Sequence, residues 1–231
     1  MKVRIKFTKT GPLKFIAHLD VMRYFQKLLR RADIPVSYSE GFSPHQILSF
    51  SHPLPLGMES MGEYADIELT EKITSKDALC ALKRESVPNI EILSFKELPE
   101  GSENAMASLF ASKYSIKFNE RAAGESLSQI ADKILSAEDI TVFKKTKTSE
   151  KYENIRPFIY ELTADEEANT LTVILSSGSV NNIKPSLLID AIALFTQNEL
   201  SKEEYSVTRL EQYTRLNGEL ISLDDVGKII V

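Results

Sequence analysis

Two segments in the first hundred residues alternate apolar and polar side chains, at 3–7 and 63–70. This period of two predicts half-buried β-strands. Residues 16–32 instead space their apolar side chains as one face of an amphipathic helix. Three further segments have weaker patterns, and they predict a short strand at 47–50, a helix at 74–85 and a strand at 90–96. The predicted order of the first half is therefore β-α-β-β-α-β.

The second half repeats this order after a predicted linker at 99–111. Its predicted elements are a strand at 114–118, a helix at 125–136, strands near 139–145, 155–162 and 170–176, a helix that starts at Pro185, and a strand at 205–209. This is again βαββαβ, with one strand extra. We therefore predict an α+β fold of two tandem ferredoxin-like (βαββαβ) domains, at residues 1–98 and 112–231. The prediction rests on element order, because no residue-level repeat is visible.

Positive charge is concentrated at the beginning of an otherwise acidic chain. The formal net charge is −5, yet residues 1–57 hold nine Lys or Arg against three Asp or Glu, together with all three histidines. The acidic average therefore does not exclude nucleic-acid binding, and the first domain is where we expect function.

The composition and the missing motifs exclude several classes of function for this chain. One cysteine, Cys80, excludes an internal disulfide and any cysteine cluster for iron–sulfur or zinc in this chain, and its helical apolar surroundings predict a buried thiol. No apolar run is long enough for a membrane helix, and no leader is visible, so we expect a cytoplasmic protein with no membrane partner. The sequence also contains no phosphate-binding glycine loop and no hydrolase or zinc-protease motif.

A row of cations is predicted on the first strand. In a ferredoxin-like sheet both helices cover one face, so Lys2, Arg4 and Lys6 would line the open face and could contact a phosphate backbone. The alternative is that Asp66 and Glu68 on the neighbouring strand neutralise this row through cross-strand ion pairs.

The predicted helix at 16–32 carries a second stripe of cations, opposite its apolar face. The stripe consists of Arg23, Lys27, Arg30 and Arg31. It could hold phosphates, dock an acidic protein surface, or be a solvated helix face.

The histidines offer candidate acid–base chemistry. His18 and Asp20 lie at the predicted helix start, and His45 follows a turn; we take these three as candidate catalytic groups, with capping or core packing as the alternative. His45 and His52 are separated by a predicted strand, which holds them about 20 Å apart, too far for one zinc ion. We therefore expect no metal site.

Three motifs occur in order: KTGPLKFIAHLD at 9–20 followed by Arg23; YSEGFSPH at 38–45; and Ser49-Phe50 followed by PLPLGMES at 53–60. Together they resemble the radical-SAM-linked domain family of unknown function, which in many members is the C-terminal extension of a radical-SAM protein and in others a separate chain. The resemblance is densest over 1–70. It implies a radical-SAM protein as partner, in RNA modification or ribosome-related metabolism, with the iron–sulfur cluster and S-adenosylmethionine held by that partner and no cofactor in this chain.

The leading hypothesis is an accessory module that binds RNA, with transfer RNA as the first candidate, for a radical-SAM enzyme. The predicted nucleic-acid-binding residues are Lys2, Arg4, Lys6, Lys14, Arg23, Lys27, Arg30 and Arg31, and a predicted pocket also includes Gly11, Tyr38, Gly41, Phe42, Pro44 and Glu59. Two alternatives stay open: an RNA-processing enzyme that uses His18, Asp20 or His45, and a protein–protein adaptor that docks on the radical-SAM partner. Whether the chain is an enzyme is not decided by its sequence.

Overall fold

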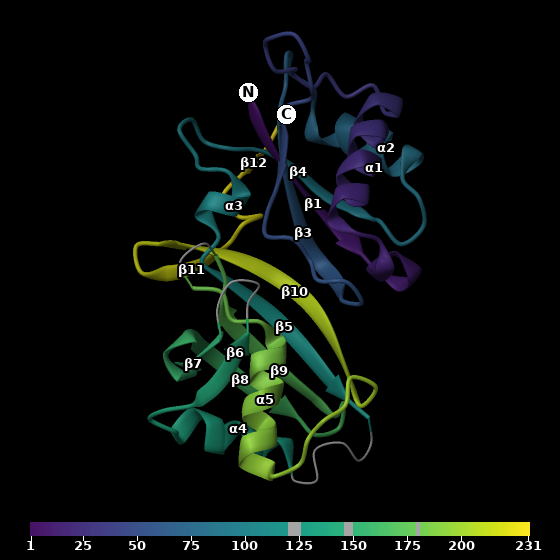
Figure 1. Cartoon of the computed structure of the whole chain (residues 1–231). Helices are drawn as coiled ribbons and strands as arrows, with labels where there is room; N and C mark the ends of the chain where they lie inside the picture. Colours follow the sequence, from purple (N-terminus) through teal and green to yellow (C-terminus); the bar gives the residue numbers. More distant parts are fainter. Residues whose placement is uncertain (120–125, 146–149, 179–180) are drawn as a thin grey trace. The chain divides into compact units, whose positions relative to one another are not determined.

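The computed structural model describes residues 1–119, 126–145, 150–178 and 181–231, and it has the predicted α+β composition (Figure 1). The chain forms two compact units. Unit 1 is Met1–Phe110 together with Glu211–Val231, and unit 2 is Ala111–Leu210. The predicted boundaries differ at the C-terminal end, because residues 211–231, predicted in the second domain, belong to unit 1. The predicted linker at 99–111 also contains a short helix, α3 (Ala105–Ser108).

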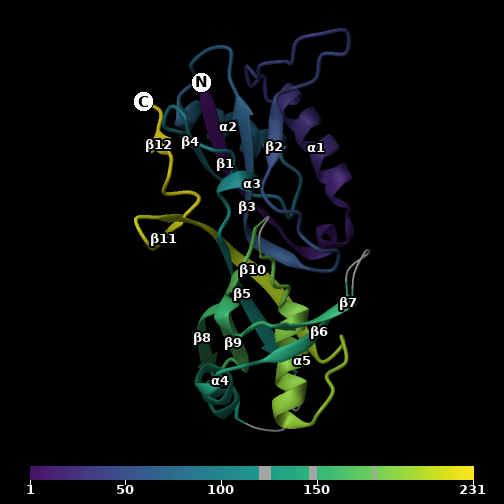
Figure 2. The ribbon, with the colours of Figure 1, turned by 60° about the vertical axis from the view of Figure 1, so that its left-hand side comes forward.

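Unit 1 is built around an antiparallel sheet with the strand order β12-β4-β1-β3, in which β2 also pairs with β3. The strands are β1 (Lys2–Lys9), β2 (Leu48–Phe50), β3 (Glu59–Glu68), β4 (Ile92–Glu97) and β12 (Lys228–Ile229). The helices are α1 (His18–Arg31), α2 (Ser75–Glu85) and the 3₁₀ helix η1 (Gly11–Phe15). The two chain ends lie side by side in both ribbon views (Figures 1 and 2).

The alternation of apolar and polar side chains along β1 determines which face of the unit 1 sheet packs against α1. Val3, Ile5 and Phe7 are buried in one core with the apolar face of α1, as predicted. The Phe7 ring lies 4.4 Å from that of Phe25, centroid to centroid. Burying side chains of this size stabilises the fold by roughly 1.5–3 kcal/mol each, so this core is what holds α1 against the sheet.

The opposite face of the unit 1 sheet is largely covered, and the predicted open cationic face is wrong for Arg4 and Lys6. Figure 1 shows α1 and α2 on one side of these strands and α3 on the other. A small second core lies on the α3 side, made of Tyr64, Ala105, Leu109 and Leu223. Residues far away in the sequence, in α3 and near Leu223, therefore cover the face of the sheet on which β1 carries Arg4 and Lys6.

Arg4 is 2% exposed and forms a two-pronged ion pair with Asp66, with nitrogen–oxygen distances of 2.8 and 2.9 Å. It also donates to the carbonyl of Leu223 at 3.2 Å, and Asp66 accepts the backbone N–H of Ala105 at 2.7 Å. Cross-strand neutralisation, the alternative considered from the sequence, is thus what the structure shows for Arg4.

Lys6 has a comparable environment. Its ammonium lies 2.6 Å from a carboxylate oxygen of Glu211, and the Tyr64 hydroxyl donates to the same carboxylate at 2.5 Å. Burial and the Glu211 charge raise the pKa of Tyr64 far above its usual value, so its hydroxyl keeps its proton. Lys6 is therefore engaged in holding the C-terminal segment.

Unit 2 has the sheet order β10-β5-β9-β8 and a separate two-stranded sheet, β6-β7. Its elements are β5 (Ala111–Phe118), α4 (Leu127–Ser136), β6 (Thr141–Lys145), β7 (Glu150–Asn154), the 3₁₀ helix η2 (Arg156–Phe158), β8 (Ile159–Asp165), β9 (Thr170–Ser176) and α5 (Pro185–Thr196). β10 (Tyr205–Leu216) begins in unit 2 and ends in unit 1, where β11 (Glu219–Ser222) pairs with it. The strand predicted at 155–162 begins later, at Ile159, and β7 was not predicted. The predicted helix start at residue 125 lies outside the described residues.

The buried Arg4–Asp66 pair generates a stability prediction. Asp66→Asn removes the carboxylate charge and leaves a buried guanidinium uncompensated, so we expect a loss of about 3–5 kcal/mol in the free energy of unfolding. Urea unfolding followed by circular dichroism measures it. Asp20→Asn is the matched control, because Asp20 pairs with Arg23 on the exposed surface of α1, where such a pair contributes at most about 1 kcal/mol. Equal losses in the two variants would contradict this account.

Candidate functional site

The outward face of α1 is the first candidate surface. Arg23, Lys27, Arg30 and Arg31 are all exposed, as the helical spacing predicts. Arg23 pairs with Asp20 at 3.2 Å and Arg31 lies 3.7 Å from Glu85. Lys27 and Arg30 form no ion pair within the described part of the chain. The stripe therefore keeps a net positive charge that is available to an anion.

The burial of α1 explains why these cations point outward. Val21, Phe25, Leu28 and Leu29 are its buried residues, and they contact the sheet. Because positions three and four apart share a face of a helix, this apolar face leaves 23, 27 and 30 together on the solvent side. The position of the stripe is thus a consequence of core packing.

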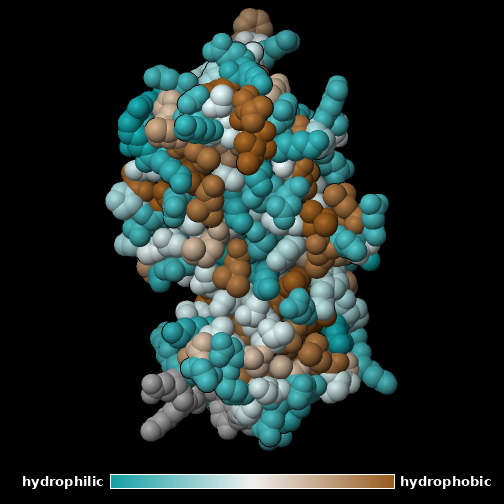
Figure 3. Space-filling view, turned by 180° about the vertical axis from the view of Figure 1, so that it is seen from behind, coloured by the Kyte–Doolittle hydropathy of each residue, from teal (hydrophilic) through white to brown (hydrophobic). Residues whose placement is uncertain are grey.

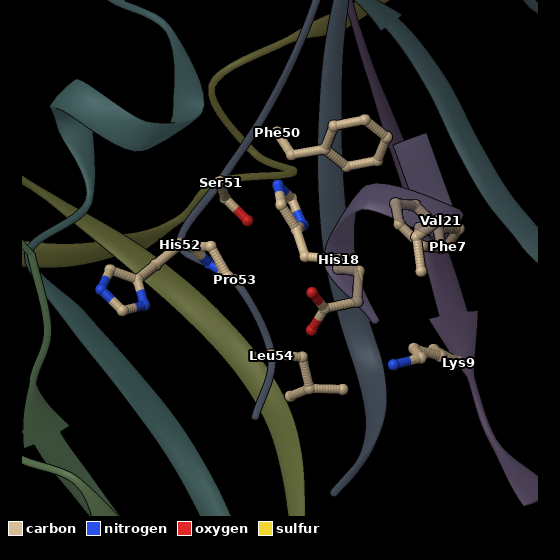
Figure 4. Close-up of a pocket in the computed structure, with 10 residues that line it drawn as sticks. Phe7, Lys9, His18, Val21, Phe50, Ser51, His52, Pro53 and Leu54 are labelled. Carbon is tan, nitrogen blue, oxygen red and sulfur yellow. The ribbon is translucent and has the colours of Figure 1, made fainter. Parts of the chain in front are cut away.

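His18, the first residue of α1, lines a small cavity of about 10 Å³. Figure 4 shows its imidazole next to Phe50, whereas the His52 ring points away from it. The His18 and Phe50 rings meet edge to face at 5.5 Å. Two charged residues, Lys9 and Glu63, are buried in the wall of this cavity. The cavity has space for roughly one water-sized group.

The surroundings of His18 favour its neutral form. Burial lowers the pKa of its imidazole; the Glu63 carboxylate raises it and the Lys9 ammonium lowers it, with a net shift downward. The Lys9 ammonium also donates to the carbonyl of Ile16 at 2.9 Å. A neutral imidazole can accept a proton or a hydrogen bond, so general-base chemistry is what this arrangement could perform.

The structure does not bring His18, Asp20 and His45 into one site. Asp20 is exposed on α1, next to Arg23. His45 is exposed in the loop before β2, where its Nδ1 lies 2.8 Å from the Ser39 hydroxyl. It lines a different cavity, of about 300 Å³. Two of the three candidate catalytic groups, His18 and His45, therefore line different cavities.

The predicted pocket residues also separate into two groups. The Glu59 carboxylate accepts the backbone N–H of Gly11 at 3.1 Å, which fixes the turn before α1. The same carboxylate lies 3.8 Å from the Lys14 ammonium and partly neutralises its charge. Gly11 has φ +56°, and a Cβ there would lie 2.9 Å from Asn89 Oδ1, which explains the glycine. The second group lies in the exposed loop before β2 and consists of Tyr38, Gly41, Phe42 and Pro44.

The comparison with known families is decisive for classification. Residues 2–185 match the family described as "Uncharacterized protein conserved in bacteria (DUF2344)". The chain belongs to this family. A search of curated proteins finds no match to it. The DUF2344 description assigns no activity, which agrees with the predicted family of unknown function.

Three titratable side chains that line the His18 cavity were not predicted as site residues: Lys9, His52 and Glu63. The strand patterns gave no signal for Lys9 and Glu63, because a charged residue within a strand is usually solvent-facing. His52 was noticed only as a potential zinc ligand. The described part of this DUF2344 chain contains no group of three His, Cys, Asp or Glu side chains arranged to hold a metal.

Two further surface features bear on the sequence predictions. Cys80 is exposed, contrary to the predicted buried thiol, because it lies on the outer side of α2. No helix among the described residues is long and apolar enough to cross a membrane. On the face shown in Figure 3, apolar side chains form separate groups among hydrophilic ones.

The lowered pKa of His18 predicts a pH-dependent stability. The unfolded chain takes up a proton near pH 6.5, whereas folded His18 takes it up only at lower pH, so the unfolded state binds more protons in this window. We expect the melting temperature to fall as the pH drops from 7.5 to 5, and to fall less in His18→Gln. Thermal scans at both pH values measure the difference. His45→Gln controls for loss of one imidazole, and a His18→Gln curve parallel to that of the wild type would refute the assignment.

Proposed function

We propose that this DUF2344 protein is an accessory RNA-binding module that presents RNA, with transfer RNA as the first candidate, to a radical-SAM partner. The observation that carries the proposal is the exposed, under-compensated stripe of Arg23, Lys27, Arg30 and Arg31 on α1. Cations in such a row neutralise phosphates and release counterions, which supplies affinity without sequence specificity. Lys2 is exposed as well, whereas Arg4 and Lys6 are removed from the binding set by their ion pairs.

The partner and its cofactors are proposed from the resemblance in the three motifs. An iron–sulfur cluster needs several cysteine ligands, and this chain has one. The cluster and S-adenosylmethionine would therefore be held by the partner. In this proposal the DUF2344 chain contributes RNA binding and positioning only.

We further propose that each unit is a variant of the ferredoxin-like arrangement. The strand order β4-β1-β3-β2 in unit 1 and β10-β5-β9-β8 in unit 2 supports it, with two helices between the strands in each case. On this interpretation β6 and β7 are an addition to unit 2. Such units recur in many RNA-associated proteins, although fold alone does not assign function.

A second candidate function, an RNA-processing enzyme, is favoured by one specific observation. Burial keeps His18 neutral beside Glu63 and Lys9, which suits a general base. The acid–base group would then be His18 with Glu63, in place of Asp20 and His45. His18→Gln separates the two functions, because it would abolish turnover in an enzyme and leave RNA affinity unchanged in an accessory module.

The RNA proposal is tested by titrating fluorescently labelled transfer RNA at 50 and 200 mM salt. If the stripe contacts about four phosphates, affinity should fall on the order of a hundredfold between these concentrations. The variant Arg23→Glu/Lys27→Glu/Arg30→Glu should lose most of the binding at 50 mM salt. It should also show a much weaker salt dependence.

The matched control is Lys72→Glu/Lys76→Glu/Lys83→Glu, which makes the same change in net charge at exposed positions on and before α2. It should bind as the wild type does. Equal loss in both triple variants would mean that overall charge, and not α1, governs binding. Absence of any wild-type binding at 50 mM would overturn the RNA proposal and favour the adaptor, whose complex with the radical-SAM protein should be salt-sensitive without RNA.

A further inference from the structure

The loop between α1 and β2 carries the most exposed large apolar side chain among the described residues. Phe42 is 112% exposed, so its ring is as open to solvent as in an extended chain. It therefore adds nothing to the packing of unit 1. A single exposed apolar residue needs no explanation by itself. Two further features of this loop, however, point to a binding role for the ring.

The first feature is a set of hydrogen bonds that close the loop on itself. The Ser39 N–H donates to the carbonyl of His45 at 2.8 Å, and the His45 N–H donates to the Ser39 hydroxyl at 3.1 Å. The same hydroxyl lies 2.8 Å from His45 Nδ1. Tyr38 and Gln46 form a β-bridge at the base of the loop. The loop is thus pre-organised, so presenting its ring to a ligand costs little conformational entropy.

The second feature is the set of side chains that the loop presents together with Phe42. Tyr38, at one end of the loop, is 51% exposed, and the imidazole of His45 is exposed at the other end. Residues 38–45 contain no Leu, Ile, Val or Met. The loop therefore offers planar rings separated by small and polar residues, which suits a planar ligand that stacks on them.

The charges near the loop separate two binding roles. Both ribbon views show this loop at the same end of unit 1 as the last turn of α1 (Figures 1 and 2). On α1, Lys27 and Arg30 form no ion pair within the part of the chain that the structure describes. In the loop, Glu40 is the only Asp, Glu, Lys or Arg among residues 38–45, and its carboxylate repels a phosphate. Phosphates are therefore favoured on α1, and an uncharged planar group is favoured at the loop.

We propose that Phe42 is a stacking platform for an unpaired base, so that the RNA held by α1 is bound at a single-stranded segment. The inference rests on the RNA binding proposed above and narrows its substrate class. In a duplex each base is already stacked between its neighbours, and its faces are closed to a side chain. In a loop or at a free end a base can turn out and stack on an aromatic ring.

Such a site does not read a particular sequence. Every base has a π-face, so stacking on Phe42 is tolerant of base identity, and Tyr38 offers a second ring in the same loop. The cations of α1 are equally indifferent to sequence, because they contact phosphates. The two parts together select RNA by its unpaired state.

The experiment titrates the full chain into fluorescently labelled oligouridylate, and separately into a G·C-rich RNA duplex of the same length, at 50 mM salt. Phe42→Ala should weaken binding of the single strand about tenfold, as expected for one lost base stack, and leave the affinity for the duplex unchanged. Because Phe42 is fully exposed, its thermal unfolding should match that of the wild type. The matched control is Phe15→Ala, which removes another exposed ring just before α1 and should bind both RNAs as the wild type does.

A second variant reports stacking directly. The chain has no tryptophan, so Phe42→Trp introduces a single indole at the position of the ring. This variant should keep the affinity of the wild type, and oligouridylate should quench its fluorescence. A strand of the same length that lacks bases should not quench it, and neither should oligouridylate quench Phe15→Trp.

The stacking assignment and the RNA proposal fail separately. Unaltered binding of oligouridylate by Phe42→Ala, equal losses for single strand and duplex, or an unquenched Phe42→Trp that still binds the strand would each overturn the stacking assignment. The RNA proposal would survive any of these results if the α1 triple variant loses binding. If the wild type binds neither RNA at 50 mM salt, both proposals are overturned, and Phe42 becomes a candidate contact for the protein partner of the adaptor alternative.

Discussion

The buried ion pair between Arg4 and Asp66 is the constraint on which the rest of unit 1 depends. A buried guanidinium must be matched by a carboxylate and by further acceptors, because its desolvation is otherwise too costly. Here the further acceptors are backbone carbonyls, that of Leu223 at 3.2 Å among them. The pair therefore joins β1 and β3 to the C-terminal segment and, through Ala105, to α3. The guanidinium of Arg4 thus connects β1 to a segment that is more than a hundred residues away in the sequence.

This constraint also fixes the two ends of the β1–β3 pair, where both cavities lie. One end carries Lys2 opposite Glu68, and the other carries Lys9 and Glu63 beside His18. A slip of β1 by one residue would reverse the faces of Lys2 and Lys9 relative to Glu63 and Glu68 on β3. The Lys2–Glu68 cavity and the His18 cavity thus lie at opposite ends of the same antiparallel pair, and the Arg4–Asp66 ion pair is two residues from the Lys2–Glu68 end.

Much of this was accessible from the sequence, and the failures have a common physical cause. Local periodicity predicted the inward face of β1, the buried side of α1 and hence the exposed stripe from Arg23 to Arg31. Periodicity identifies which face of a strand a residue occupies, but it does not tell whether a distant segment covers that face. Arg4 and Lys6 were therefore expected in solvent. The His18 cavity was missed for the same reason, since Lys9 and Glu63 are buried by residues brought together only by folding.

Unit 1 is assembled from both ends of the chain, so its completion depends on contacts between residues that are far apart in the sequence. Every residue of unit 2 is synthesised before Glu211–Val231, which completes unit 1. Closing such a long loop is entropically costly while the intervening chain is disordered. Within unit 1, the backbone N–H of Phe110 donates to the carbonyl of Tyr213 at 2.8 Å, so the point where the chain leaves this unit lies beside the strand by which it returns. Residues 111–210 are therefore an insertion in the chain of unit 1, and unit 1 itself holds the two ends of that insertion next to each other.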